Sequence, residues 1–313
     1  MNKNTKICLN YLVGGTISLI LLWSIYGQVT RQLSGINSNT WKLTGPAVWL
    51  WLSIALMFLN TSLESYKWYL LTNFVEPVVY TKSLASYLAG IAFSIVTPNR
   101  IGEYPGRILY LGRTNTFRYI NVSILGIMSQ LSTIYFFGLA GLIYYNFSFP
   151  SLIAKAGLAS CFIVVVILVI IYCRFELWLP LMAKIKWFNR FAVYGKLLYR
   201  ITTKRQISVL SISLFRFIIF TAQYLFLLRW MNVNVPLAEG FCIAALFFWI
   251  MAVIPGVALT ELGLRSKTSL VLFQAFSTNS IGILAATAGI WMLNLIIPSV
   301  IGSIIILRMR WLR

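Results

Sequence analysis

The sequence predicts an all-α polytopic membrane protein, a single membrane domain over residues 1–313 with six transmembrane spans and two re-entrant helical hairpins in an inverted repeat. The composition gives the class, because 59% of the residues are hydrophobic and only 10% are charged, against about 25% charged in a soluble domain. Several apolar segments are long enough to cross about 30 Å of hydrocarbon. Two further apolar segments are each interrupted by Pro, Gly and Glu, a combination that lipid-facing helices rarely carry.

Six apolar segments are long enough for a full crossing as an α-helix. The first follows a short basic N-terminus, as in a signal peptide, but no small-residue cleavage site follows its apolar run. We therefore expect a retained span there. The six predicted spans are Ile7–Gly27, Pro46–Tyr66, Tyr119–Tyr145, Ser151–Cys173, Ile207–Trp230 and Ile281–Leu307.

Two shorter apolar stretches, Ser83–Val96 and Ala238–Ile254, are marginal for a full crossing. The first runs into TPNRIGEYPGR (residues 97–107) and the second into IPGVALTELGLR (residues 254–265). We predict that each stretch folds back with the segment after it as a re-entrant hairpin, and an ordinary bundle of eight full spans is the alternative. The residues expected to break the helices or to allow close backbone approach are Pro98, Gly102, Pro105, Gly106, Pro255, Gly256 and Gly263.

The distribution of Lys and Arg predicts the topology. The linker 174–206 holds eight basic residues and one acidic residue, so we place it in the cytoplasm, with interfacial helices on the inner leaflet. The segments 67–82 and 113–118 and both termini then also lie inside, provided that each hairpin returns to the side it entered from. Three crossings in each of the halves 7–145 and 151–307 make the second half inverted relative to the first, as in many transporters.

The two motifs carry Glu and Arg four residues apart, so each pair lies on one face if the segment is helical. In one interpretation, Glu103–Arg107 and Glu261–Arg265 are internal ion pairs that let a polar hairpin persist in lipid. In the other, the hairpin tips meet near the membrane midplane, where Arg100 and Arg107 offer guanidinium forks to a phosphate. Helices that begin after the motif glycines would add backbone N–H donors.

Other polar residues of the spans are expected to face the same interior. Glu64 lies one turn from Asn60, and an Arg at the depth of Arg216 needs a counter-ion, for which Glu64, Glu103 and Glu261 are candidates. Gln130, Gln223 and Asn294 complete this set, with hydrogen bonds between helices the favoured role for Gln130 and Asn294. The predicted substrate-binding residues are Glu64, Arg100, Glu103, Arg107, Arg216, Glu261 and Arg265.

The sequence contains no His and no Asp. This excludes His-based metal sites, Ser-His and Cys-His nucleophilic catalysis and paired-Asp proteolysis, and no Walker loop is present. We therefore expect that the protein is not an enzyme and binds no cofactor and no metal.

The net charge of +20 would suit a protein that binds nucleic acid, but the basic residues lie in loops between spans. We therefore expect anionic lipid head groups as partners and no nucleic acid. The four cysteines have no paired spacing and are predicted to be buried thiols.

The motifs Pro-x-x-x-Gly-Glu-x-x-x-Arg at 98–107 and Pro-Gly-x-x-x-x-Glu at 255–261 resemble those of the lysylphosphatidylglycerol synthase transmembrane region, a flippase-like family. Members typically carry Pro-Gly-Gly-x-Gly in the second motif and a Gly-Gly pair in the first, where this chain has only one Gly and Asn99-Arg100. The resemblance implies a prokaryotic-type inner or plasma membrane protein that moves a lipid or polyprenyl-linked intermediate between leaflets. The fused aminoacyl-transferase domain of the synthases is not implied, since the chain ends at Arg313.

We therefore expect a lipid flippase or translocase for a phosphate-bearing lipid or a polyprenyl-linked intermediate. The alternative is a non-transporting accessory membrane subunit of cell-envelope polysaccharide or glycolipid biosynthesis. An intramembrane transferase that uses Glu as a base is a third possibility, disfavoured by the absence of His and Asp.

Overall fold

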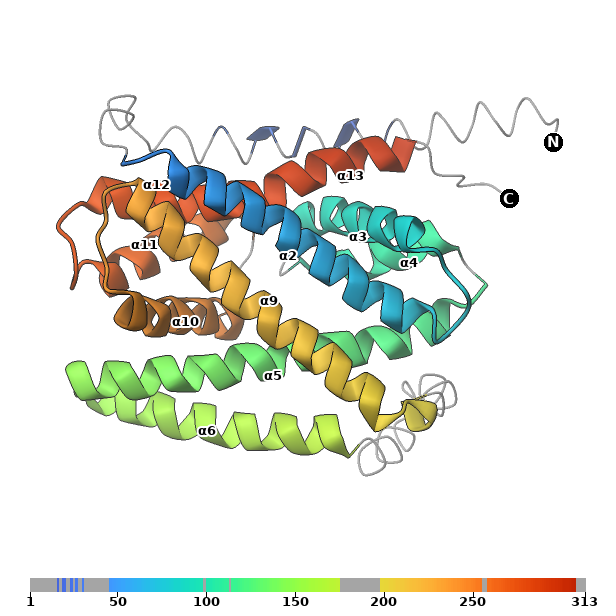
Figure 1. The fold of residues 1–313 in the computed structure, drawn as a ribbon, viewed down its shortest axis with the longest axis horizontal. Coiled ribbons are helices and arrows are strands. Elements are labelled where there is room, and N and C mark those ends of the chain that lie inside the picture. Colours follow the sequence, from blue (N-terminus) through green and yellow to red (C-terminus); the bar gives the residue numbers. More distant parts are fainter. Residues whose placement is uncertain are drawn as a thin grey trace.

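A computed structural model describes residues 45–97, 100–112, 114–174, 198–254 and 258–307, with isolated positions between 16 and 30; of 258–262 the backbone alone is described. Every regular element within these ranges is a helix (Figure 1). Proceeding along the chain, they are α2 (Val48–Thr72), α3 (Tyr80–Ile95), α4 (Glu103–Leu111), α5 (Thr116–Ser148), α6 (Leu152–Cys173), η3 (Leu198–Arg200), α9 (Thr203–Trp230), α10 (Leu237–Val253), α11 (Ala258–Phe273), α12 (Ser280–Trp291), η4 (Met292–Ile296) and α13 (Ile297–Leu307).

Within the described residues, five helical segments are long and apolar enough to cross a membrane, and they coincide with five of the six predicted spans. They are α2, α5, α6, α9 and the composite segment Ser280–Leu307. The first predicted span, 7–27, lies largely outside the described residues, as does most of the linker 174–206.

One predicted loop boundary is wrong. Lys67 was expected in a cytoplasmic loop, but α2 continues to Thr72 and buries this side chain. The reason is local, because Lys67 follows Glu64 by three residues and pairs with it inside the bundle.

Two pairs of shorter helices lie at opposite ends of the bundle (Figure 1). The first pair is α3 and α4. Its two outer ends, the start of α3 and the last residues of α4, lie where α2 finishes and α5 starts. The helix α10 begins, and α11 ends, at the other end, where α9 finishes and α12 starts. Glycine lets α3 and α4 approach closely, because a Cβ on Gly90 would lie 2.5 Å from the carbonyl oxygen of Glu103.

The helices α2 and α9 lie against each other, and on either side of them a helix from the N-terminal part of the chain packs on one from the C-terminal part. The helix α3 packs on α13, while α10 packs on α5. A glycine mediates each contact: a Cβ on Gly302 of α13 would collide with the carbonyl oxygen of Leu88 in α3, and one on Gly141 of α5 with that of Cys242 in α10. Small residues at such positions are typical of helices that pack within membranes.

The last span is interrupted by the π-helical segment η4. Pro298 accounts for the interruption, because it has no N–H for the carbonyl of Asn294 and its ring conflicts with that carbonyl in a regular α-helix. Such π segments are frequent at functional sites. Here the segment places the side chain of Asn294 in the bundle interior, where it hydrogen-bonds other helices.

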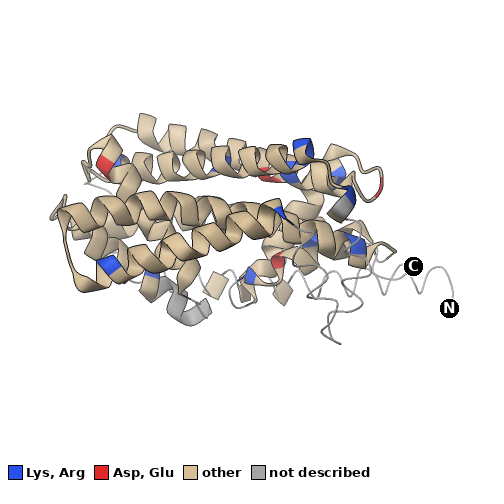
Figure 2. Cartoon of the chain, turned by 90° about the horizontal axis from the view of Figure 1, so that it is seen from below, with Lys and Arg blue, Asp and Glu red and all other residues tan. Residues whose placement is uncertain are grey.

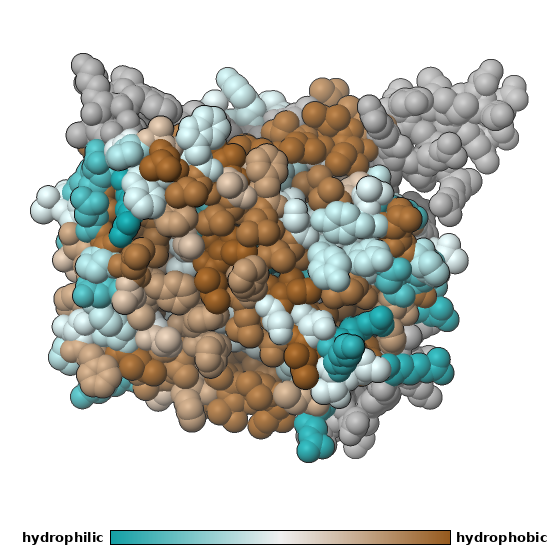
Figure 3. Space-filling model, viewed as in Figure 1, coloured by the Kyte–Doolittle hydropathy of each residue, from teal (hydrophilic) through white to brown (hydrophobic). Residues whose placement is uncertain are grey.

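The outer surface is apolar. Figure 3 shows a broad hydrophobic region across the middle of one face, with hydrophilic residues toward its two ends. The helix α6 exposes most of its length, since only Ala154, Cys161, Leu168 and Tyr172 of its 22 residues are buried. An apolar surface of this extent marks contact with lipid, so the chain is an integral membrane protein.

The described basic side chains are unevenly distributed (Figure 2). More of them lie at the end of the bundle where α2 finishes and α9 begins than at the opposite end. Those at the richer end are Lys82, Arg118, Arg174, Arg200, Lys204 and Arg205.

Candidate functional site

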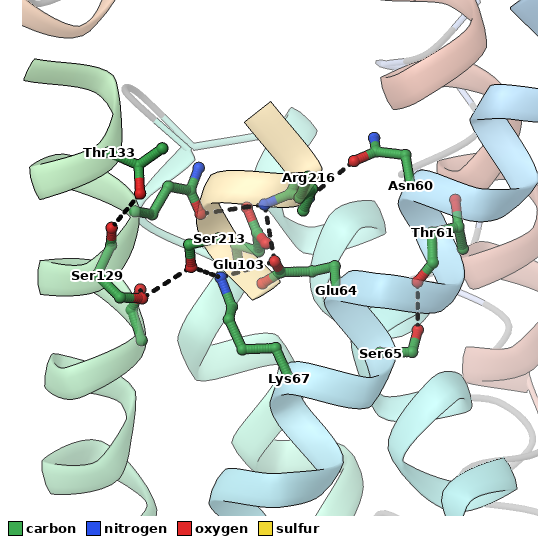
Figure 4. A network of polar contacts seen from close by, with 12 residues as sticks. Asn60, Thr61, Glu64, Ser65, Lys67, Glu103, Ser129, Thr133, Ser213 and Arg216 are labelled. Carbon is green, nitrogen blue, oxygen red and sulfur yellow. Dashed lines mark hydrogen bonds and ion pairs between the residues drawn. The ribbon is translucent and has the colours of Figure 1, made fainter. Parts of the chain in front are cut away.

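The carboxylate of Glu64 lies at the centre of a buried group of charges (Figure 4). Its side chain is 1% exposed and accepts from Lys67 Nζ at 2.8 Å, Arg107 Nη2 at 3.0 Å and Arg216 Nη1 at 2.7 Å. These cations come from α2, α4 and α9, so a single carboxylate joins three helices. We call Glu64, Lys67, Glu103, Arg107 and Arg216 the Glu64 cluster. Charges persist in a protein interior only when they are paired in this way.

Arg107 connects α4 to α2 through the buried carboxylate of Glu64. Its guanidinium forms ion pairs with Glu103 and with the central carboxylate, and it lies 4.8 Å from the ring centre of Tyr87 and 4.9 Å from that of Tyr104. The ring of Trp68 is 5.5 Å away. The side chain is 1% exposed, so it is held by cation–π and ionic contacts in the interior. The i, i+4 pair predicted from the first motif is present.

Arg216 has a different position, at the boundary between the cluster and open space. Its Nε donates to Asn60 Oδ1 at 2.8 Å, and its Nη1 donates to Glu64 Oε2 and to Gln130 Oε1 at 3.2 Å. A guanidinium has five N–H groups, and the two on Nη2 make no hydrogen bond to any side chain or backbone group in the described part of the chain. The side chain is 20% exposed. Arg216 is therefore oriented by protein acceptors while one edge of its fork remains available.

A chain of amides extends the cluster toward the last span. Asn60 Nδ2 donates to Asn294 Oδ1 at 2.7 Å, and Asn294 Nδ2 donates to Gln223 Oε1 at 2.9 Å. Gln223 in turn donates to the carbonyl of Ser53 at 2.9 Å. These bonds connect α2, α9 and η4, and together with the bond from Arg216 to Gln130 they confirm the inter-helix role predicted for Gln130 and Asn294.

The sequence interpretation missed Lys67. Its ammonium also lies 3.5 Å from Ser213 Oγ, which is 2.9 Å from Ser129 Oγ of α5. Figure 4 shows Lys67 on the side of Glu64 opposite Asn60. The spacing Glu64-x-x-Lys67 was the signal that could have identified it, because residues three apart are neighbours on a helix.

A cavity of about 590 Å³ lies beside the Glu64 cluster and draws its lining from helices throughout the chain. Its lining contains both charged or polar side chains and large apolar ones. The long polar and charged side chains in the lining are Asn60, Arg100, Glu103, Gln130, Arg216, Arg265 and Asn294. The larger apolar side chains include Phe217, Phe220, Phe247, Phe248, Met251 and Trp291. The cavity is therefore amphipathic.

Four of the predicted binding residues, Arg100, Glu103, Arg216 and Arg265, line this one cavity. Glu64 and Arg107 are buried behind it. Arg107 was expected to offer its fork to a phosphate, but in the structure its guanidinium is held by carboxylates and aromatic rings instead.

The two motifs differ in how much of them is described. Gly102 directly precedes α4, as predicted, and Pro105 and Gly106 lie within that helix. Gly263 has open space where a Cβ would be. The side chain of Glu261 lies outside the described residues, as do Pro98, Pro255 and Gly256. Among the side chains that are described, no three of His, Cys, Asp or Glu gather as metal ligands would.

The fold and the site define a polytopic helical membrane protein with a charged internal cavity. The family model of the lysylphosphatidylglycerol synthase TM region matches residues 11–306, which is nearly the whole chain. The protein therefore belongs to this family of integral membrane proteins. A comparison with curated proteins gives no match.

Proposed function

We propose that this protein moves a lipid with a phosphate-bearing head group, or a polyprenyl-linked intermediate, from one leaflet to the other. The observation that supports this most directly is the amphipathic cavity. Its arginines suit an anionic head group, while its aromatic and aliphatic side chains suit the first methylene groups of a tail. A free inorganic ion would need no such apolar lining.

The proposal includes an inverted repeat with two re-entrant hairpins. The α3–α4 and α10–α11 pairs return to opposite ends of the bundle, as hairpins from opposite leaflets would. The last helix of each half packs, through Gly141 or Gly302, against the first hairpin helix of the other half. Repeats of this kind place the binding site at their interface and alternate its exposure between the two faces.

The uneven distribution of basic residues supports an orientation. The end rich in Lys and Arg is placed in the cytoplasm, so the α3–α4 hairpin opens inward and the α10–α11 hairpin opens outward. Both termini are then cytoplasmic, in a prokaryotic-type inner or plasma membrane. Movement of a head group requires no bond to be made or broken, and we propose that the protein is not an enzyme.

Reconstituted proteoliposomes test the function. Fluorescent phosphatidic acid in both leaflets is bleached by dithionite from outside, and the fraction that becomes accessible over time reports exchange between leaflets. We expect the wild-type protein to accelerate exchange over protein-free liposomes, and Arg216→Gln to lose most of the acceleration. Arg118→Gln is the matched control, because Arg118 is exposed on α5 away from the cavity lining. Lipid binding without any acceleration would favour the accessory-subunit alternative.

A further inference from the structure

We infer that the cavity selects a head group that ends in a phosphate dianion, namely a phosphomonoester or a diphosphate, over a phosphodiester such as that of phosphatidylglycerol or phosphatidylcholine. The inference rests on the proposed function, because it names the substrate class of the same cavity. Three observations support this preference for a dianion: the net positive charge around the cavity, the two N–H groups of Arg216 Nη2 that make no hydrogen bond within the described residues, and the scarcity of carboxylates in the cavity lining.

The charge balance of the region is positive. Among the described side chains, the Glu64 cluster and the cavity lining together hold five cations and two carboxylates, a formal surplus of three positive charges. If the carboxylate of Glu261 is included, four residues before Arg265 in the sequence, two positive charges remain. The five cations are Lys67, Arg100, Arg107, Arg216 and Arg265.

Unbalanced charge inside a membrane protein is costly, and a bound anion of opposite charge removes that cost. A phosphodiester brings one negative charge and leaves part of the surplus. A phosphomonoester brings about 1.5 to 2 negative charges near neutral pH. The dianion is therefore the better electrostatic match to this cavity.

Arg216 supplies the geometry for such a ligand. Its Nε and Nη1 are fixed by Asn60, Glu64 and Gln130, so the guanidinium plane is held before a ligand arrives. The two N–H groups on Nη2 can then meet a terminal phosphate oxygen without loss of the existing bonds. Such an orientation lowers the entropic cost of binding, because the side chain is already ordered.

The rest of the described wall offers little to a positively charged head group. Glu103 is the one described carboxylate in the lining, and it is already paired with Arg107. Apart from the three arginines, the other polar side chains of the lining carry amides and hydroxyls, which are neutral. A choline or an aminoacyl group would bring a cation next to three lining arginines, whereas a terminal phosphate would not.

Binding to the full-length protein in detergent tests the inference without any transport step. The ligands are dioctanoyl phosphatidic acid, phosphatidylglycerol and phosphatidylcholine, titrated by calorimetry, with glycerol 3-phosphate as the head group without tails. We expect phosphatidic acid to bind at least about tenfold more tightly than phosphatidylglycerol, since a tenfold ratio requires only about 1.4 kcal/mol of added attraction. Phosphatidylcholine is expected to bind most weakly. Glycerol 3-phosphate is expected to bind more weakly than phosphatidic acid, because it cannot use the apolar wall.

Variants assign the preference to the cavity. Arg216→Gln is expected to reduce the affinity for phosphatidic acid to nearly that for phosphatidylglycerol, while Arg118→Gln leaves both affinities unchanged. If Arg216→Gln does not fold, Arg265→Gln removes one charge from the same wall and is expected to reduce the ratio several-fold, with the melting temperature measured alongside.

The possible outcomes separate the two proposals. Equal affinities for the three lipids, or tightest binding of phosphatidylcholine, would overturn the dianion inference and leave lipid movement intact. Equal binding of glycerol 3-phosphate and phosphatidic acid would assign the site to free phosphate esters instead. A clear preference for phosphatidic acid in a protein that does not accelerate lipid exchange would uphold the inference and contradict the proposed function.

Discussion

Arg216 of α9 donates a hydrogen bond of 2.7 Å to the carboxylate of Glu64 in α2, across 152 residues of sequence. The same carboxylate accepts from Lys67 and Arg107. One acidic side chain thus holds three basic ones in place in the interior of the bundle. Its removal leaves more positive charge without a partner than any other single substitution in this cluster.

Glu64→Gln is therefore expected to destabilise the protein strongly. Breaking a buried ion pair by removal of one partner typically costs about 3–5 kcal/mol, because the remaining charge stays buried. The melting temperature in detergent, followed by tryptophan fluorescence, measures the effect. Glu239→Gln is the control, since Glu239 forms no ion pair with the described residues and contributes at most to the N-terminus of α10. Equal melting temperatures for the two variants would contradict the role assigned to Glu64.

Removal of one cation should restore part of the lost stability. In Glu64→Gln the ammonium of Lys67 remains close to two arginines without the central carboxylate. The double variant Glu64→Gln with Lys67→Met removes that charge and keeps an apolar chain of similar length. We expect the double variant to melt above Glu64→Gln and below the wild type, and a double variant that melts lower than the single one would show that the charges are not coupled as described.

The glycines at the crossings of α3 with α13 and of α10 with α5 give a prediction about packing. Gly302→Ala and Gly141→Ala each place a methyl group against backbone of the neighbouring helix. Overpacking of this kind typically costs about 1–3 kcal/mol. Gly289→Ala is the control, because its new methyl group would meet Leu227 at an ordinary 3.6 Å. Lower yield of monodisperse protein and a lower melting temperature are expected for the first two variants alone.

The π segment gives a prediction about hydrogen bonding. Asn294→Leu keeps the volume of the side chain but leaves Asn60 and Gln223 without one partner each. A buried polar group that loses its partner costs about 1–3 kcal/mol. The melting temperature should therefore fall. Gln223→Leu in the same background should then cost less than it does alone, because the bond between the two amides is already absent.

Cysteine labelling tests the opposite orientation of the two helix pairs in the proposed topology. Thr114 lies in the connection from α4 to α5, and Thr278 in that from α11 to α12; both are exposed. In a background without the native cysteines, Thr114→Cys and Thr278→Cys are treated with a membrane-impermeant maleimide in intact cells and in inverted vesicles. Thr278→Cys should react in intact cells and Thr114→Cys in inverted vesicles. Reaction of both from the same side would exclude hairpins that enter from opposite leaflets.

Much of the fold could be predicted because hydropathy alone sets the length and position of membrane helices. Helix α6 was predicted to within one residue, since it is apolar throughout and bounded by Pro150 and Arg174. The end of α2 was misplaced because Lys67 has the polarity of a loop residue, and only its neighbour Glu64 explains its burial. The i, i+3 spacing of the two residues is compatible with an ion pair, but it does not show whether that pair lies in a loop or inside the bundle.

The site was predicted only in part, because the sequence shows which charged residues need partners but not which partners they have. Arg216 needed a counter-ion, and Glu64 was one of the three available carboxylates. Two of the aromatic rings around Arg107, those of Trp68 and Tyr87, come from α2 and α3, and no spacing within α4 reveals them. The π segment was not predicted, because the consequence of Pro298 for Asn294 depends on helices that lie far away in the sequence.

The most direct test of the central claim is an experimental density map of the protein in nanodiscs that contain phosphatidic acid. The account predicts lipid density inside the cavity, with a phosphate within about 3 Å of the Arg216 guanidinium and a tail along Phe217, Phe220 and Phe248. Lipid head groups found only around the outer surface, with the cavity closed by protein side chains, would contradict it.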